Sequence, residues 1–202
     1  MSALSSIERI PLQTSILSPL LIVLVCLGAA AIAQKAPPSK PFERFDGCVL
    51  DPDEWTDGDS FRVQLPDGRF ETFRLYFVDT TESRSRGKRS DEQAAYFGLT
   101  RAQAIDLGRQ AKIFTASALA RPFTICTRWR SVFGPTRYYA IVVTPGGRDL
   151  NELLVSSGLA RIYGTRTPLP DGRDSREYLA HLHELENEAR AAKCGAWDKA
   201  QQ

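Results

Sequence analysis

The chain has 202 residues, a hydrophobic fraction of 43% and a formal net charge of +2 at pH 7. This charge is far below that of proteins that coat polyanions non-specifically, so a polyanion site has to be a local basic patch, such as Arg84, Arg86, Lys88 and Arg89, unless those residues form an ordinary solvated face. With only two histidines, both on one predicted helix, the sequence disfavours a zinc centre and histidine-dependent nucleophile schemes.

Residues 1–33 have the pattern of a secretion signal. An apolar run over residues 16–33 turns to small residues and ends in AIA, which matches the small-x-small site of signal peptidase. Because little positive charge precedes this run, the segment could instead be an uncleaved membrane anchor. A third interpretation is a lipoprotein with its lipid attached to Cys26. The sequence thus predicts a secreted or periplasmic protein, anchored in the membrane if the segment is not cleaved.

Residues 34–41 (QKAPPSKP) have the composition of a flexible linker. The remaining residues 42–202 are enough for one core and too few for two, so we predict a single domain. In an oxidising compartment this domain is compatible with one disulfide, which we expect between Cys48 and Cys126.

Short stretches rich in Val, Ile, Phe and Thr predict the strands of this domain. They are residues 46–50, 60–65, 70–78, 123–130 and 138–144, with a shorter extended segment at 159–163. The second and third stretches flank the turn Pro66-Asp67-Gly68, so they form the clearest predicted hairpin.

Apolar residues at helical spacing predict the helices. They are expected at residues 93–119, as two helices, and at 150–157 and 175–193. Gly98 and Gly108 interrupt the first region, and Asp149 is the predicted cap of the next helix. This order of elements predicts an α+β, mainly β domain: a five-stranded OB-type Greek-key barrel with about three packed helices.

Two acidic segments have the composition of a divalent-cation site. Asp57-Gly58-Asp59-Ser60 precedes one strand and Asp79-Thr80-Thr81-Glu82 ends another, and hard cations take oxygen ligands from separate segments. Each segment on its own is also ordinary turn or cap chemistry. The predicted hairpin brings both to one rim of the barrel, which favours a shared site.

Arg74 lies in mid-strand between residues that we expect to be buried, so its guanidinium needs a carboxylate partner or an anionic ligand. Strict alternation places Arg74 and Asp79 on opposite faces of the strand. The two residues can share a site only if the strand twists or bends before Asp79.

The stretch DGDSFRVQLPDGRFETFRLYFVDTTES, which starts at Asp57, resembles the staphylococcal nuclease (thermonuclease-like) family in spacing and identity. The resemblance continues through LGRQAKIFTASAL, RYYAIV, LNELLVSSGLARIY and the final GAW, and it covers residues 45–197. It implies a calcium-dependent phosphodiesterase, an endonuclease that hydrolyses DNA and/or RNA. We expect single strands to be its preferred substrate and a monomer to be its oligomeric state.

The resemblance also implies roles for individual residues. Asp59 and Asp79 would bind calcium through their carboxylates and Thr80 through its backbone carbonyl, while Glu82 would be the general base. Such a set suits phosphodiester hydrolysis, which has to deprotonate a water molecule and neutralise charge on the non-bridging oxygens.

Arg74 and Arg137 match the two arginines with which this family holds the phosphate, and Tyr163 either contacts a nucleotide phosphate or packs inside the fold. The sequence departs from the family pattern at two places. Thr81 stands where proline is usual, and two additional residues precede Arg137.

Two other hypotheses remain. OB barrels also bind single strands without cutting them, so the chain could be a catalytically inactive OB-type nucleic-acid-binding module. It could also be an exported structural domain that binds no polyanion. The complete set of acidic and arginine residues favours the enzyme.

Overall fold

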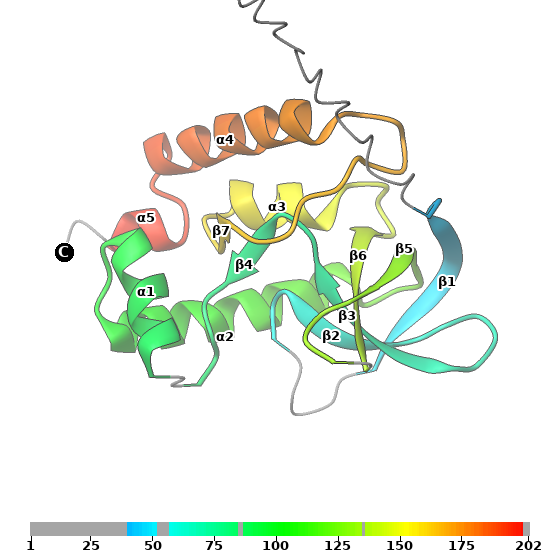
Figure 1. The fold of residues 1–202 in the computed structure, drawn as a ribbon. Coiled ribbons are helices and arrows are strands. Elements are labelled where there is room, and N and C mark those ends of the chain that lie inside the picture. Colours follow the sequence, from blue (N-terminus) through cyan, green and yellow to red (C-terminus); the bar gives the residue numbers. More distant parts are fainter. Residues whose placement is uncertain (1–39, 52–56, 85–86, 135, 200–202) are drawn as a thin grey trace, which may run out of the picture. The chain divides into compact units, whose positions relative to one another are not determined.

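The structure is a computed structural model of the chain, and it describes residues 40–51, 57–84, 87–134 and 136–199 (Figure 1). These residues belong to one compact unit, Ser39–Gln202. The predicted signal or anchor at residues 1–33 lies outside the described residues, as do residues 34–39 of the predicted linker. Within the described ranges, no helix is long and apolar enough to cross a membrane.

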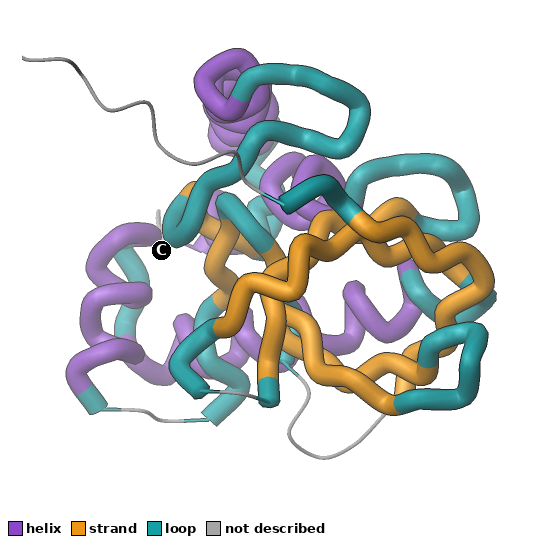
Figure 2. Tube along the Cα trace, turned by 45° about the vertical axis from the view of Figure 1, so that its right-hand side comes forward, coloured by secondary structure: helices purple, strands orange, loops and turns teal. Residues whose placement is uncertain are grey.

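Five strands close into a barrel, the ring of orange tube in Figure 2. They are β1 (Glu43–Asp51), β2 (Ser60–Gln64), β3 (Phe70–Leu75), β5 (Phe123–Ser131) and β6 (Arg137–Val143). Neighbours follow the order β1-β2-β3-β6-β5, and β5 returns to β1. The β3–β6 pair is parallel and the other pairs are antiparallel. The five barrel strands that the sequence predicts are therefore all present, and side chains such as Phe61, Phe73 and Ile125 are buried in the core.

The chain bends where the sequence predicts one continuous strand over residues 70–78. β3 stops short of this, Phe77 adopts a positive φ of 66°, and the chain resumes as β4 (Val78–Thr80). β4 pairs with β7 (Ala160–Ile162) in a separate two-stranded sheet. The buried ring of Phe77 packs edge-on against Tyr178, with 4.9 Å between the ring centroids. The single predicted strand was wrong because alternation does not reveal a bend inside an apolar run.

Five helices pack around the two sheets in the described part of the chain. They are α1 (Lys88–Phe97), α2 (Arg101–Ala118), α3 (Leu150–Ser156), α4 (Ser175–Ala191) and α5 (Ala196–Lys199). In Figure 1, α4 lies over α3, and α2 runs along the opposite side of the sheets. The description as mainly β, with about three helices, does not hold, because helices contain more of the described residues than strands do.

Local signals in the sequence fix the break between α1 and α2. Gly98 ends α1 in the left-handed conformation, at φ 68°. Thr100 then caps α2: its side chain accepts a hydrogen bond from the N–H of Gln103, whose side chain accepts one from the N–H of Thr100. Gly108 lies inside an unbroken α2, so the interruption predicted there was wrong.

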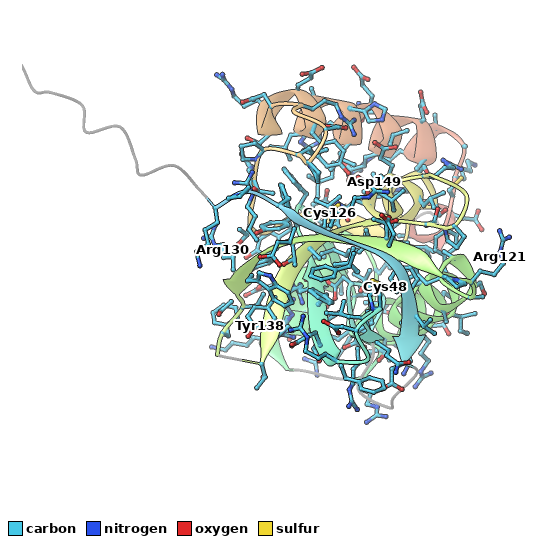
Figure 3. The ribbon with its side chains drawn as sticks, turned by 90° about the vertical axis from the view of Figure 1, so that its right-hand side faces the viewer. Cys48, Arg121, Cys126, Arg130, Tyr138 and Asp149 are labelled. Atoms are coloured by element: carbon cyan, nitrogen blue, oxygen red, sulfur yellow. The ribbon has the colours of Figure 1, made fainter. Side chains whose placement is uncertain are left out.

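Cys48 and Cys126 are free thiols, so the predicted disulfide between them was wrong. Both are buried, on β1 and β5 (Figure 3), but the strand register sets Cys48 opposite Phe123 and Cys126 opposite Arg44. The thiol of Cys48 donates to the carbonyl oxygen of Phe45 at 3.3 Å. Burial raises the pKa of the Cys48 thiol to about 11, which keeps it protonated and unreactive at neutral pH.

Asp149 caps α3, as the sequence predicts, and its carboxylate lies on the side of the barrel that faces α4 (Figure 3). It accepts hydrogen bonds from the N–H of Asn151 and from the hydroxyl of Tyr178 on α4, each at 2.8 Å. Burial nevertheless raises the pKa of Asp149 from 3.8 to about 6. A raised folded-state pKa stabilises the protonated form, so this contribution is complete below about pH 4 and is lost as the pH rises through about 6.

We expect the Asp149→Asn variant to lose this pH dependence. Asparagine is an equally good cap and stays uncharged. The difference in free energy of unfolding, variant minus parent, should therefore rise by up to about 3 kcal/mol from about pH 4 to pH 7. Urea denaturation of both proteins at the two pH values measures this difference. Parallel pH profiles of the two proteins would contradict the burial of a charged Asp149.

Candidate active site

A cavity of 840 Å³ opens on the outside of the barrel, next to the two-stranded sheet. Four of the residues that the sequence predicts for the site line this cavity: Arg74, Glu82, Arg137 and Tyr163. The other three are buried: Asp59 and Asp79 lie next to Arg74, and Thr80 donates its N–H to Asp59. The structure therefore brings all seven predicted residues to one place, four on the cavity wall and three behind it.

The register of β3 and β6 explains why two arginines face the same cavity. Thr72 is paired with Arg137 in this parallel pair of strands. Two residues further along, Arg74 is paired with Tyr139. Because side chains alternate along a strand, all four point to the same side of the barrel. Burial lowers the pKa of Arg137, and the positive charge of Arg74 lowers it further, as expected for two guanidinium groups in one site.

The additional residues before Arg137 do not displace it. Arg137 is the first residue of β6, and its carbonyl oxygen accepts a hydrogen bond from the N–H of Val132 at 2.8 Å. Its Nη1 donates to the hydroxyl of Ser60 on β2, on the far side of β3, at 3.3 Å. Phe133, at the start of the connection, has a φ of 45° and a side chain that is 98% exposed. Arg137 therefore keeps its place at the start of β6.

Asp79 is fully buried, and its carboxylate accepts four hydrogen bonds. The donors to Oδ1 are Nη2 of Arg74 and Nη2 of Arg89, both at 2.5 Å. The donors to Oδ2 are Nε of Arg161 at 2.8 Å and Nε2 of Gln93 at 2.9 Å. Burial alone would raise the pKa of Asp79, but Arg74, followed by the other donors, outweighs burial and holds this pKa below its usual value. Asp79 is therefore a charged group in the interior.

Arg74 and Asp79 can share a site only if the strand bends between them, and the bend at Phe77 does this. Arg74 lies on β3 and Asp79 on β4, and the two strands belong to different sheets. The backbone turn between them re-aims the carboxylate of Asp79, so that it reaches the guanidinium of Arg74. The positive φ of Phe77 thus helps to bring Asp79 to Arg74.

Asp59 is the second carboxylate next to Arg74. Its Oδ2 lies 2.9 Å from Nη2 of Arg74 and accepts a hydrogen bond from the N–H of Thr80 at 3.0 Å. Burial raises the pKa of Asp59 to about 7, with Arg74 opposing this shift and the charge of Asp79 adding to it. The two carboxylates therefore differ: Asp79 holds its charge firmly, whereas Asp59 holds it weakly without further positive charge nearby.

Glu82 is held through both its side chain and its backbone. Its Oε1 accepts a hydrogen bond from Nε of Arg89 at 2.6 Å. Its N–H donates to Oε1 of Gln93 at 3.0 Å, and the amide of Gln93 also donates to the carbonyl oxygen of Thr80 at 2.9 Å. One buried glutamine side chain thus sets the path of the backbone from Thr80 to Glu82.

Helix α2 supports both acidic segments with one face. A methyl group added at Gly108 would lie 2.5 Å from the carbonyl oxygens of Thr81 and Glu82, so the helix approaches this segment closely. Thr115, seven residues further, donates its hydroxyl to the carbonyl oxygen of Gly58 at 2.7 Å. Residues seven apart lie on the same face of a helix, so a single rigid element sets the spacing between the two segments.

Tyr163 lies at the cavity with 55% of its surface exposed, so the alternative of a tyrosine packed inside the fold does not hold. The guanidinium of Arg161 lies 4.3 Å from the centroid of the Tyr163 ring. Since Arg161 also donates to Asp79, it connects the exposed ring to the buried carboxylate.

Three residues that organise the site were not assigned from the sequence: Arg89, Gln93 and Arg161. Arg89 was counted with a basic patch or a solvated face, whereas it pairs with two acidic residues. The pairing of Arg161 with Asp79 follows from the β4–β7 register, which is not apparent before the bend is known. Gln93 carried no signal, because glutamine in a helix is ordinarily a surface residue, yet here it is fully buried.

The predicted cation ligands suit a hard cation by their chemistry. The described residues hold no cluster of three or more His, Cys, Asp or Glu side chains that could bind a metal, but one of the three predicted ligands is a backbone carbonyl. Nη2 of Arg74 lies 2.9 Å from Asp59 and 2.5 Å from Asp79, so a positive group already stands between the two carboxylates. The hydroxyls of Thr80 and Thr81 are buried without a hydrogen-bond partner among the described residues. These oxygens fit a cation, provided that an arginine yields its place.

The fold and the cavity define a five-stranded barrel domain with an acidic and arginine-rich site on its outside. Comparison with protein-family models matches residues 72–199 to the family described as staphylococcal nuclease homologue. The protein belongs to this family, which confirms the resemblance seen in the sequence, and the family's domains are generally nucleases. Asp59 precedes the matched range and the other predicted site residues lie within it. A search of curated proteins gave no match.

We expect Gly108→Ala to destabilise the protein, although alanine ordinarily stabilises a helix relative to glycine by about 1 kcal/mol. The added methyl group would meet two backbone oxygens at 2.5 Å, and such overpacking costs about 1–3 kcal/mol. Urea denaturation measures the change. Gly146→Ala is the matched control, because its nearest neighbour would lie 3.9 Å away. A Gly108→Ala variant more stable than the parent would contradict the close approach of α2.

Proposed function

We propose that the protein is a calcium-dependent phosphodiesterase that cuts DNA or RNA. The observation that carries this proposal is that Arg74, Arg137 and Glu82 line one cavity while the carboxylates of Asp59 and Asp79 lie next to Arg74. Hydrolysis of a phosphodiester needs a base for the attacking water and positive charge for the non-bridging oxygens, and this cavity offers both.

In this proposal Arg74 and Arg137 bind the scissile phosphate. The hydrogen bond that Arg137 makes to Ser60 goes to a neutral hydroxyl, so its positive charge is available to an anion in the cavity. The planar guanidinium groups can each donate two parallel hydrogen bonds to phosphate oxygens. A well-aimed charged donor of this kind contributes roughly 10²- to 10³-fold to the rate.

Glu82 takes the proton from the attacking water. Its side chain is 15% exposed, which leaves it open to the cavity, and its backbone is fixed by Gln93. A positioned general base contributes roughly 10²- to 10⁴-fold to the rate. Arg89 donates a hydrogen bond to Oε1 of this carboxylate and fixes its position.

The carboxylates of Asp59 and Asp79 and the carbonyl oxygen of Thr80 would hold the calcium ion. When bound, calcium supplies positive charge beside the phosphate on which negative charge builds up. Arg161 and Gln93 bind Oδ2 of Asp79 from the buried side, so Oδ1 is the oxygen that Asp79 can present.

Single strands are the proposed substrate, and a monomer is the proposed active form. The rings of Phe133 and Tyr163 line the cavity with 98% and 55% of their surface exposed. Aromatic rings in such positions stack on unpaired bases, which a duplex does not offer. The apolar N-terminal segment at residues 1–33 supports the further proposal that the protein is secreted or periplasmic, and anchored in the membrane if this segment stays attached.

Replacing the base should stop the reaction without unfolding the protein. We expect Glu82→Gln to lower the rate of cleavage of single-stranded DNA by at least about 100-fold, with a circular-dichroism melting curve close to that of the parent. Glu92→Gln, an exposed position on α1, is the matched control and should cut at the parent's rate. Cleavage by Glu82→Gln at the parent's rate would show that another residue is the base.

Calcium dependence is tested by the release of acid-soluble nucleotides from single-stranded DNA, with calcium added and with chelator. We expect release only with calcium, because the phosphate and the two carboxylates need a shared cation. Release in chelator would contradict the role of calcium. Binding of single strands without release under either condition would favour the inactive binding module instead.

A further inference from the structure

Arg89 connects the two acidic functions of the site. Its Nη2 donates to Oδ1 of Asp79 at 2.5 Å and its Nε donates to Oε1 of Glu82 at 2.6 Å. One guanidinium group therefore neutralises both a proposed calcium ligand and the proposed base. Arg89 lies in the first turn of α1, immediately after Lys88, and it lines the cavity.

The three arginines around Asp79 differ in how far their side chains are buried and in how many partners hold them. Arg161 is 7% exposed and sits directly across the β4–β7 ladder from Asp79. Arg74 is 16% exposed and has Asp59 as a second partner. Arg89 is 40% exposed, so its side chain has free space toward solvent. Of the three, Arg89 is the one that can leave Asp79 at least cost.

A divalent cation at Oδ1 of Asp79 has to displace a positive group. Nη2 of Arg74 and Nη2 of Arg89 both lie 2.5 Å from this oxygen, so a cation bound there would be repelled by both charges, and Arg89 is the one with space to move away. Oδ2 is no alternative, because the buried groups Arg161 and Gln93 already occupy it. Calcium and Arg89 therefore compete for Oδ1 of Asp79.

We propose that Arg89 is an internal cation that competes with calcium for Asp79 and so sets the calcium concentration at which the active site assembles. The proposal rests on the proposed function. Without calcium, Arg89 keeps Asp79 neutralised and Glu82 tied down, so the site is stable but closed to the metal. By linkage, calcium weakens the contact of Arg89 with Asp79 by the same factor by which Arg89 weakens calcium binding.

The proposal predicts that Arg89→Gln binds calcium more tightly than the parent. Loss of a partly exposed ion pair that competes with the metal should lower the calcium Kd by about 3- to 10-fold. Titration calorimetry of the full chain, freed of metal by chelator, measures this Kd. Lys88→Gln is the matched control: it removes the same charge one residue away, at an exposed position, and should leave the Kd close to that of the parent.

A second variant separates competition from a structural role. Arg89→Lys keeps the charge but cannot bridge two carboxylates, so its Kd should fall between those of the parent and Arg89→Gln. If Arg89 only holds the fold together, both variants would melt at lower temperature and bind calcium more weakly, which would overturn the proposal. Unchanged affinity in Arg89→Gln, or an equal gain in Lys88→Gln, would overturn it as well.

The same titration separates this proposal from the proposed function. A parent that binds calcium and cuts DNA, with no tighter binding in Arg89→Gln, would overturn only the competition by Arg89. Absence of calcium binding in the parent and in Arg89→Gln alike would overturn both. Calcium binding by Arg89→Gln alone would support the competition in its strongest form, with Arg89 keeping the parent's site closed.

Discussion

A charged carboxylate can remain in a protein interior only if hydrogen bonds and positive charge surround it, and this requirement governs the environment of Asp79. Its four partners are Arg74 on β3, Arg89 and Gln93 on α1, and Arg161 on β7. They lie on three different elements, and Arg161 is 82 residues away in the sequence, so one buried group draws the barrel, the small sheet and a helix to a single point. Removal of either of the two more buried arginines, Arg74 or Arg161, would leave the charge of Asp79 poorly compensated, which makes these partners interdependent.

Two backbone features turn this electrostatic requirement into a definite geometry. The positive φ at Phe77 sends the chain from one sheet to the other, and thereby aims Asp79 at Arg74. Because residue 108 is a glycine, α2 can lie against the carbonyl oxygens of Thr81 and Glu82. Main-chain contacts with rigid elements thus place the segments that carry the acidic residues, and hydrogen bonds to the carboxylates then fix the side chains.

The sequence predicts the five barrel strands, the Asp149 cap of α3 and the seven residues that the structure brings to the cavity. Local patterns suffice for these features, because alternation, capping residues and the family motif all act over short distances. The bend at Phe77, the two free cysteines and three of the four partners of Asp79 were not predicted. They depend on register and on contacts between distant segments, so a residue such as Arg161 has no local property that distinguishes it from a surface arginine.

Because Asp79 lies on β4, outside the barrel, the site combines residues of the barrel with residues of the two-stranded sheet. The barrel ladders hold Arg74 and Arg137, whereas the short β4–β7 ribbon holds Asp79 and Arg161. Proteins open in sub-global steps, but every residue of this ribbon except Ile162 is buried, and Arg74 ties Asp79 to the barrel, so the ribbon opens only by breaking those contacts. Its opening would part the carboxylate of Asp79 from Arg74 and leave a buried charge without compensation. On heating, the geometry of the site should therefore be lost together with the fold and not in an earlier local step.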